Sequence, residues 1–456
     1  MRKKLNFKEV LLVGSLLFGL FFGAGNLIFP LELGQRAGVN LTPVTIGFLI
    51  SAIGLPILGI VATGLSDSDS LFDSAKPAGD SFAYFFTILL YLTIGPGFAI
   101  PRTATVSYEV GLKEFVKAND TLFLLVFSLV FFLLAFYFAI KEGNLIDTIG
   151  KYMTPIFLIL LAFIGIMGLV KPMGKAASVS PIEKYQSSPF TVGIIDGYNT
   201  LDAPASLAFA VLIISSIKNL GVKDPADIGK ETLKAGLVCL LCMGIVYSSL
   251  AFLGSTSAHI MDGGENGAII LAKIASHYLG SVGHILLSLI VFIACLKTAI
   301  GLISACSEMF STMLSLNISY KKYCIIFSIV SFLIANLGLS RIISLSIPVL
   351  MFLYPLSIAL IFLSMFSIKT GKREKIYKWT LAFTAAAAAF FDLLVNLPES
   401  ISKSHIVENI LLVPNKFLPG FSLGFGWVLP AILGFIIGYI IDKNTKKSKI
   451  TYTTGK

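Results

Sequence analysis

Apolar segments of about 20 residues recur along the whole chain and alternate with short polar stretches. This is the length that an α-helix needs to cross the hydrocarbon core of a bilayer. The pattern therefore predicts an all-α polytopic membrane protein with about twelve transmembrane helices and no separate soluble domain. The spans are expected at 9–34, 41–64, 81–109, 121–140, 152–170, 190–217, 233–254, 284–315, 322–338, 342–367, 376–397 and 424–441.

Polar residues and glycines interrupt two of these spans, the first and the sixth. The first contains "GAGN" at 23–26 and the sixth contains "DGYNTLDAPA" at 196–205. Each interrupted span begins a set of five, and an odd number of spans inverts the second set in the membrane. We therefore expect a 5+5 inverted repeat with broken helices 1 and 6, plus two C-terminal helices. Repeat one covers about 9–170, repeat two about 190–367 and the extra helices about 376–441, all in one transmembrane transporter domain over 1–456.

Two breaks at corresponding positions indicate the binding site of a secondary transporter. Glycines let the backbone leave the helix, and they leave room for a ligand. The free N–H groups that begin the next half-helix attract an anion, and free carbonyls at the end of the preceding half coordinate a cation. The alternative is that Gly23 and Gly25 only allow close helix packing, and the matching break in the sixth span argues against it.

Composition and charge support a membrane protein. The 456 residues are 56% hydrophobic and only 13% charged, which a soluble protein of this length does not accommodate. The net charge of +10 does not indicate nucleic-acid binding, because the basic residues lie between spans. Segments on the side of the N-terminus hold the larger share of Lys and Arg. This bias places both termini in the cytoplasm. The N-terminus lacks a small-x-small cleavage site, so a retained first span is expected rather than a signal peptide.

Other classes of membrane protein fit the sequence less well. A membrane-embedded enzyme needs a nucleophile, acid pair or histidine inside its spans, whereas His259, His277 and His284 are expected at the surface of an outer loop. No GxxxxGK[ST] motif is present, so ATP is not expected to drive the protein. A channel rarely has two broken helices within twelve spans. The five cysteines are expected to be packing residues, and no cofactor is expected beyond a coupling ion, Na+ or H+.

Three stretches resemble the branched-chain amino acid:cation symporter family, the BrnQ-like carriers. They are "LFFGAGNLIFPLELGQRAG" (20–38), "LTIGPGFAIPRTATVSYEVG" (92–111) and "GYNTLDAPASLAFA" (197–210). The resemblance covers the whole chain and implies the LeuT-type inverted-repeat fold. It also implies sodium- or proton-coupled uptake of leucine, isoleucine and valine across the bacterial plasma membrane. The alternatives are a transporter or exchanger of another small apolar amino acid, or a sensor that does not transport.

A branched-chain amino acid is a zwitterion with an apolar tail, and each part has candidate partners. The carboxylate is expected at the first break and the ammonium group at the second, while the tail needs a small apolar pocket. The candidates are Gly23, Ala24, Gly25 and Asn26 for the carboxylate, Tyr198, Asn199 and Thr200 for the ammonium, and Phe21, Ile94, Phe98 and Leu302 for the tail.

Three ionisable residues within spans are candidates for ion, proton or gating roles. Asp202 follows the second break and could bind a cation, carry a proton or cap the second half-helix. Arg102 and Glu109 are seven residues apart, so they share one face of the third span. They could form a buried structural ion pair or an inner gate. Pro96 and Pro101 are expected to kink this span.

Lys297 departs from the pattern of sodium-coupled relatives. The resemblance implies a cation site made by the carbonyls of Gly19 and Phe22 and by Ala294, position 297 and Thr298. Relatives often have threonine at the position of Lys297. We expect that its ammonium group replaces the sodium ion, so that transport is proton-coupled through Lys297 or is an exchange. Alternatively, Lys297 lies one register off and snorkels or pairs with Asp202 or Glu308. A separate ion site near Asn26 and Asp202 could still bind sodium.

Overall fold

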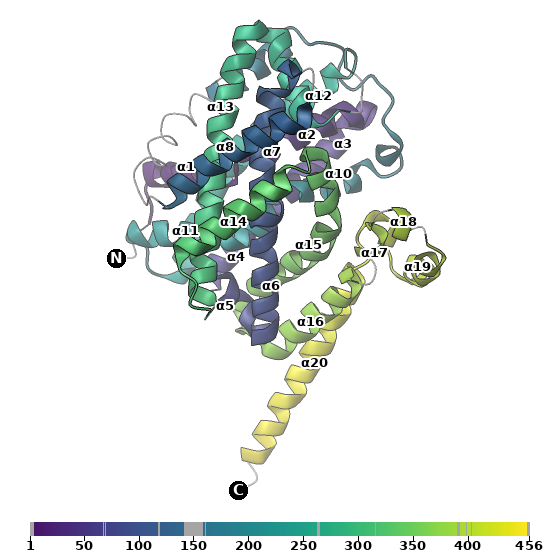
Figure 1. Cartoon of the computed structure of the whole chain (residues 1–456). Helices are drawn as coiled ribbons and strands as arrows, with labels where there is room; N and C mark the ends of the chain where they lie inside the picture. The colour runs from purple at the N-terminus through teal and green to yellow at the C-terminus, as the bar shows by residue number, and fades with distance from the viewer. Residues whose placement is uncertain are drawn as a thin grey trace.

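The computed structural model of the chain is built from helices, with no β-strand among the residues that it describes (Figure 1). These are residues 4–453 except 67, 69, 117–118, 141–157, 160, 262–264, 315, 390–392, 398 and 403. The helices of the first half are α1 (Phe7–Phe21), α2 (Ala24–Ala37), α3 (Leu41–Leu49), α4 (Leu55–Leu65), α5 (Leu71–Ala75), α6 (Asp80–Leu92), α7 (Ala99–Gly111) and α8 (Asp120–Ile140).

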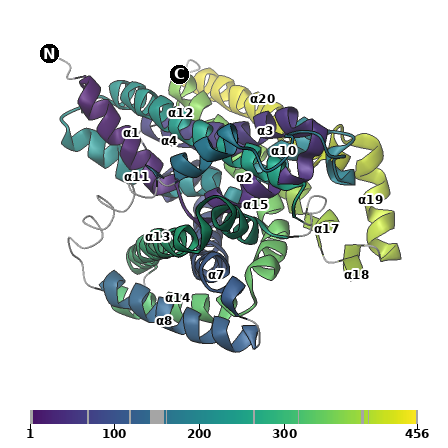
Figure 2. The ribbon, with the colours of Figure 1, turned by 90° about the horizontal axis from the view of Figure 1, so that it is seen from above.

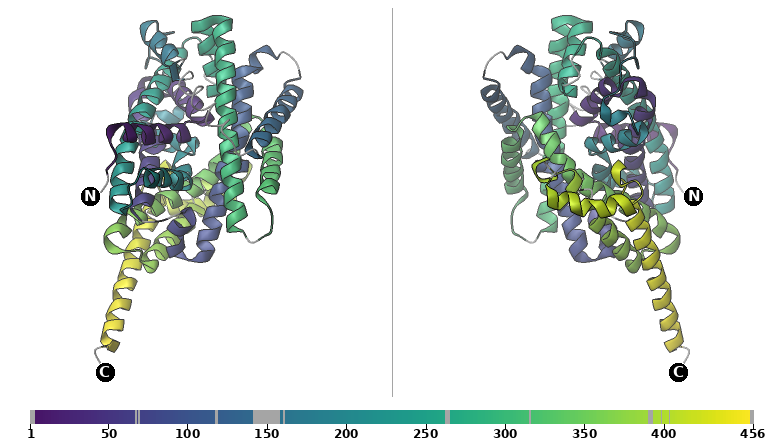
Figure 3. Two further views of the ribbon diagram at one scale, coloured as in Figure 1. Left: turned by 90° about the vertical axis from the view of Figure 1, so that its left-hand side faces the viewer. Right: turned by 90° about the vertical axis from the view of Figure 1, so that its right-hand side faces the viewer.

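The second half has longer helices and extends to the C-terminus. These are α10 (Pro189–Gly197), α11 (Asp202–Asn219), α12 (Pro225–Ser257), α13 (Gly267–Met313), α14 (Tyr320–Ala335), α15 (Leu339–Thr370), α16 (Glu374–Ala387), α17 (Leu393–Val395), α18 (Glu399–Ser402), α19 (His405–Phe417) and α20 (Val428–Thr453). Seen from above, α13 and α7 lie near the centre, and α8 and α14 lie side by side along one edge (Figure 2). α16 packs along α20, which extends past the rest of the bundle (Figure 3).

The expected number of spans is not confirmed. The described residues contain seven helices that are long and apolar enough to cross a membrane, or eight if the bent pair Pro189–Thr200 and Asp202–Asn219 is one span. One of the seven, Gly25–Leu65, has 41 residues and would extend about 60 Å at about 1.5 Å per residue. That length is about twice the bilayer core. The chain turns within it at Gly38, whose φ is 52°, so this segment holds half of the first expected span and all of the second.

Several expected spans are shorter than a full crossing in the structure. The ninth and eleventh correspond to α14 and α16, and part of the segment expected at 152–170, residues 152–157 and 160, lies outside the described residues. Only Leu161–Val170 of that segment is seen as an apolar helix. The inverted repeat and the boundaries of its two halves stay predictions.

Both predicted breaks are present. α1 ends at Phe21 and α2 begins at Ala24, with Phe22 and Gly23 in extended conformations between them. α10 ends at Gly197, a 3-10 turn covers Tyr198–Thr200, and α11 begins after Leu201. Leu201 has a left-handed backbone with φ 66°, and the two half-helices are bent by 48°. Glycines and short polar residues stop both helices within apolar sequence, as the pattern predicted.

The third expected span is also broken, but at one proline rather than two. α6 ends at Leu92 and is followed by a π-helical turn over Thr93–Gly97. This turn is interrupted at Gly95, whose ψ of −127° is not helical. Pro96 lies in this break. Pro101 lies in the first turn of α7, where a helix tolerates proline because the N–H group at that place has no partner in the helix. The predicted kink at Pro96 is therefore confirmed, and the one at Pro101 is wrong.

Candidate functional site

A cavity of about 840 Å³ lies between the two broken helices. Gly23, Gly25 and Asn26 of the first break and Thr200 and Asp202 of the second line it. Further lining residues come from α1, α7, α11, α12 and α13. A cavity of this size encloses a ligand as small as an amino acid.

Three charged side chains contribute to the described lining of this cavity: Arg102, Asp202 and Lys297. The cavity therefore has two cationic groups and one carboxylate, and all three lie within an apolar bundle. Ionisable groups in such surroundings are costly unless they are paired or have a function. The described residues include no group of three His, Cys, Asp or Glu side chains placed to hold a metal ion.

Asp202 connects both breaks to α12. Its Oδ2 accepts a hydrogen bond from Asn26 Nδ2 at 2.7 Å and another from the Tyr247 hydroxyl at 3.3 Å. Asn26 Nδ2 also donates to the Tyr247 oxygen, while Asn26 Oδ1 accepts from the backbone N–H of Gly23 at 3.0 Å. All three side chains are buried. The three residues form a closed hydrogen-bonded cluster, which we call the Asn26–Tyr247–Asp202 cluster.

Arg102 is hydrogen-bonded to the backbone of the second break. Its Nη1 donates to the backbone carbonyl of Asn199 at 2.7 Å, and its Nη2 donates to Ser346 Oγ of α15 at 2.5 Å. Its guanidinium lies over the ring of Phe29, with 5.4 Å between Cζ and the ring centroid. Arg102 thus joins α7, the second break, α15 and α2, while only 2% of the residue is exposed.

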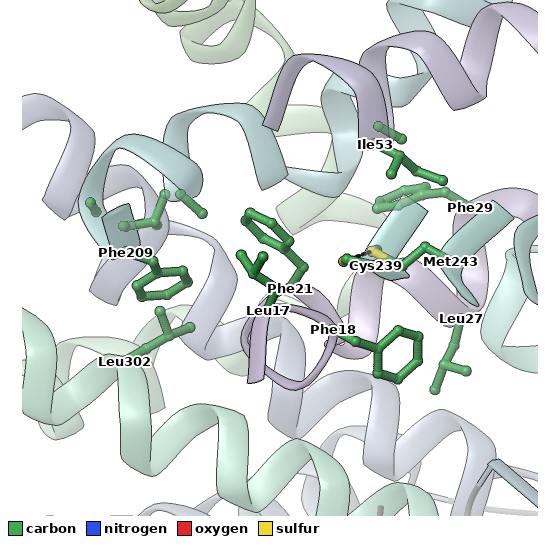
Figure 4. Close-up of a cluster of buried hydrophobic side chains, with 14 of the residues drawn as sticks. Leu17, Phe18, Phe21, Leu27, Phe29, Ile53, Phe209, Cys239, Met243 and Leu302 are labelled. Atoms are coloured by element: carbon green, nitrogen blue, oxygen red, sulfur yellow. Dashed lines mark hydrogen bonds between the residues drawn. The ribbon is translucent and has the colours of Figure 1, made fainter. Parts of the chain in front are cut away.

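The apolar part of the cavity is made by large side chains of several helices. Phe21 of α1, Phe209 of α11, Leu302 of α13 and Ile94 near the α7 break all line it. Figure 4 shows Phe21, Phe209 and Leu302 around one space, with Leu17 beside them. Such a surface accommodates an aliphatic side chain by burying its apolar area.

The helix that contains Lys297 passes directly beside the first break. A Cβ atom at Gly23 would lie 3.5 Å from the methyl group of Thr298. Lys297, Thr298 and Gly19 line the cavity, whereas the Thr298 hydroxyl donates to the carbonyl of Ala294 on its own helix at 3.1 Å. The two segments of the expected cation site are therefore adjacent.

Not every predicted residue reaches the cavity. Of the predicted substrate residues, Phe21, Gly23, Gly25, Asn26, Ile94, Thr200 and Leu302 line it, and Ala24 contributes the first residue of α2. The described lining omits Phe22, Phe98, Tyr198, Asn199 and Ala294. Tyr198 is buried behind the break, where its ring stacks on Tyr354 at a centroid distance of 3.9 Å. The aromatic ring next to the break therefore packs into the scaffold.

The predicted ion pair between Arg102 and Glu109 is wrong. Glu109 accepts a hydrogen bond from Asn266 Nδ2 at 2.5 Å and lies 3.5 Å from Lys113 Nζ. Seven residues separate the two groups by about 10 Å along the helix, and each meets a nearer partner on another segment. Glu109 also lies beside the segment that precedes α13, which is the outer side under the predicted orientation, so an inner gate at this residue does not agree with that orientation.

A second correction concerns His284, which was expected at the surface. It is buried within α13, with 1% of its surface exposed. Its Nε2 lies 2.8 Å from the carbonyl of Val110, and its Nδ1 lies 2.9 Å from Ser276 Oγ. The imidazole therefore links α13 to the end of α7, because α13 runs further into the presumed loop than the hydropathy pattern indicated.

Two residues of the site, Tyr247 and Phe209, were not predicted from the sequence. Tyr247 has a hydroxyl in an apolar stretch, and it follows the buried residues Cys239 and Met243 at intervals of four. This helical spacing places it on the inward face of α12. Phe209 follows Ala205 by four residues on α11 in the same way. The spacing was visible in the sequence, but the contact of Tyr247 with Asp202 and the place of Phe209 in the cavity wall were not.

A segment outside the spans ties down the outer end of the second broken helix. Lys184 pairs with Asp196 Oδ1, and the Tyr185 hydroxyl donates to Asp196 Oδ2 at 2.6 Å. Asn40 Nδ2 donates to the carbonyl of Tyr185 at 2.9 Å. Burial, together with the nearby carboxylate of Asp196, raises the pKa of Tyr185 above its ordinary value, so the hydroxyl remains a donor. Asp196 is thus bound to this segment instead of lining the cavity.

Broken half-helices around a cavity with charged and apolar walls define a membrane transporter of the broken-helix class. Two solved structures have the same fold. MhsT in complex with L-phenylalanine matches with a TM-score of 0.54 and 17% identity, over 96% of this chain and 100% of that one. The inward-facing conformation of Mhp1 matches with a TM-score of 0.59 and 13% identity, over 97% and 95%. The expected LeuT-type fold is confirmed.

Sequence comparisons identify the family. Residues 6–445 match the family described as "Branched-chain amino acid transport protein". The branched-chain amino acid permease BrnQ of Lactobacillus delbrueckii subsp. lactis is 42% identical over 98% of this chain and 100% of its own length. The permease BraB of Bacillus subtilis is 40% identical over 97% of each chain. The chain belongs to this family of multi-pass membrane transporters, as its three signature stretches predicted.

Proposed function

We propose that the protein imports branched-chain amino acids across the bacterial plasma membrane by alternating access, coupled to a cation, with both termini in the cytoplasm. The observation that carries the proposal is the cavity between the two breaks, which combines Asp202 and Arg102 with the apolar residues Phe21, Phe209 and Leu302. The names of the relatives support the substrate class. The neighbour that holds L-phenylalanine supports an amino acid as ligand.

The substrate lies between the half-helices in this proposal. Its carboxylate meets the N-terminus of α2 beside Gly23, where the N–H groups of Ala24, Gly25 and Asn26 have no partner within the helix and favour an anion. Its branched side chain lies among Phe21, Ile94 and Leu302. Leucine uptake by proteoliposomes, measured with a sodium gradient, a proton gradient or neither, tests the function. Absence of uptake under all three conditions would contradict it.

Lys297 occupies the cation site beside the first break in this proposal. The cavity already has two cationic side chains and one carboxylate, so a further cation would meet a net positive surrounding. A lysine ammonium carries the charge of a sodium ion and donates to the same kind of carbonyl oxygen. Coupling to protons or exchange then follows, because the ammonium group takes the place of the sodium ion.

We expect Lys297→Thr to make transport depend on sodium. In the original protein a sodium gradient should change the initial rate of leucine uptake little, while a proton gradient should drive it. In the variant the sodium gradient should raise the rate on the order of tenfold, a usual size for coupling between two ligands. Uptake by proteoliposomes measures both rates.

Lys273→Thr is the matched control, because Lys273 lies on the same helix, is exposed and pairs with Glu265 away from the cavity. This control should keep the ion dependence of the original protein. Strong sodium-driven uptake by the original protein would show that Lys297 does not replace sodium. The protein would then be interpreted as an ordinary sodium symporter.

A further inference from the structure

The polar groups expected to bind the substrate ammonium have other partners in the structure. The carbonyl of Asn199 accepts from Arg102 at 2.7 Å. The hydroxyl of Thr200 donates to the carbonyl of Gly197 at 2.9 Å. Tyr198 lies behind the break against Tyr354, outside the described lining of the cavity. The second break therefore presents few free acceptors of its own, and an ammonium group needs another partner.

Asp202 provides that partner. It is the only carboxylate in the described lining of the cavity. Both hydrogen bonds from Asn26 and Tyr247 end on its Oδ2. Oδ1 takes no part in these two bonds, and the Thr200 hydroxyl, the other polar group beside the carboxylate, donates to the Gly197 carbonyl. Asp202 lines the cavity, and only 4% of the residue is exposed. A ligand in the cavity can therefore donate a hydrogen bond to Oδ1.

We propose that Asp202 binds the α-ammonium group of the substrate through Oδ1, and that Tyr247 and Asn26 are its positioning residues. The proposal rests on the function proposed above and specifies one part of that site. A salt bridge to Asp202 pairs the positive charge of the incoming ammonium with the only carboxylate of the described lining. The substrate's own carboxylate is then directed away from Asp202, toward the N–H groups of α2.

The positioning role follows from the direction of the hydrogen bonds. Asn26 Oδ1 is occupied by the N–H of Gly23, so the amide must point its donor atom toward Asp202 and Tyr247. The Tyr247 hydroxyl accepts from Asn26 and donates to Asp202. Together they fix Oδ2, and the planar carboxylate then has its Oδ1 fixed as well. The cluster therefore holds the ammonium site in one place relative to both broken helices.

The test compares ligands that contain only part of leucine. Isoamylamine has the branched tail and the ammonium group, and isocaproate has the branched tail and the carboxylate. Their dissociation constants and that of L-leucine are measured by calorimetry on the purified full-length protein in nanodiscs, at fixed pH and sodium concentration. Each ligand is tested against the original protein and against Asp202→Asn, which keeps the shape of the side chain and removes its charge.

We expect D202N to weaken leucine and isoamylamine by about 100-fold, because each loses a charge-assisted hydrogen bond. Isocaproate should bind D202N as well as it binds the original protein, or more tightly, because an anion no longer faces a carboxylate. Retained isocaproate binding also shows that the variant is folded. Equal weakening of leucine and isocaproate would overturn the proposal, since a structural role or a cation site at Asp202 affects both ligands alike.

Tyr247→Phe tests the positioning role. It should raise the dissociation constants of leucine and isoamylamine about tenfold and leave that of isocaproate unchanged, since one hydrogen bond to the carboxylate is removed. Tyr377→Phe, at a buried tyrosine of α16 outside the described lining, should change none of the three. An equal effect of Y247F on all three ligands would overturn the positioning role. If the original protein does not bind leucine at all, the proposed function fails instead, and this result is distinct from both outcomes above.

Discussion

An Arg102→Lys variant is expected to lose leucine uptake by about 100-fold, because lysine cannot replace a planar guanidinium that bonds in two directions. Arg102 donates through Nη1 to the Asn199 carbonyl and through Nη2 to Ser346. A lysine ammonium is a single point of charge and cannot reach both acceptors from one position. The carbonyl at the second break would then be buried without its partner, and the break would lose its connection to α15.

The measurement is the initial rate of leucine uptake per folded carrier in proteoliposomes. Arg341→Lys is the matched control, because Arg341 is an exposed arginine near the start of α15, the helix that also holds Ser346. The control should keep the original rate. Removing only one of the two bonds with Ser346→Ala should cost about tenfold, less than R102K does. Uptake by R102K at close to the original rate would show that neither bond holds the break for transport.

The breaks could be predicted from the sequence because their causes are local. Glycines and short polar residues within apolar stretches favour a break in the helix through local backbone effects, so the approximate starts of α2 and α11 follow from the chain itself. The family was also visible in short runs of residues that cross these breaks. Asp202 was a candidate on the same grounds, since a carboxylate within a span is seldom without a function.

The partners of these residues could not be predicted, because they come from distant parts of the chain. Asn26, Tyr247 and Asp202 belong to three helices, and the sequence around any one of them does not predict that the other two are its partners. The prediction for Arg102 and Glu109 failed for the same reason. A shared helix face brings two residues to one side, but the nearer Ser346 and Asn266 determine the actual contacts. The count of twelve spans is not confirmed by helix length, because broken helices divide a hydropathy segment into shorter pieces.

A Gly254→Ala variant is expected to be less stable than the original protein by about 2 kcal/mol in free energy of unfolding. An alanine Cβ at this position would lie 2.1 Å from the carbonyl oxygen of Leu31. That oxygen belongs to the backbone of α2, so it cannot turn away as a side chain would. The reciprocal contact, Gly34 against Ala251, is equally close, with a Cβ at 1.9 Å from the Ala251 oxygen. The two helices can therefore separate only by moving as whole bodies.

Gly244→Ala supplies the matched control on the same helix. No atom lies within 4 Å of the Cβ that this change would add, so only the helix propensity changes, by about 1 kcal/mol in favour of alanine. Thermal unfolding of both purified variants in detergent should show G254A melting below the original protein and G244A melting at or above it. If both alanines raised the melting temperature alike, the close contact of α2 with α12 would not contribute to stability. A lower melting temperature in G254A alone would mean that this contact holds α2, and with it Asn26 and the first break, against the helix that provides Tyr247.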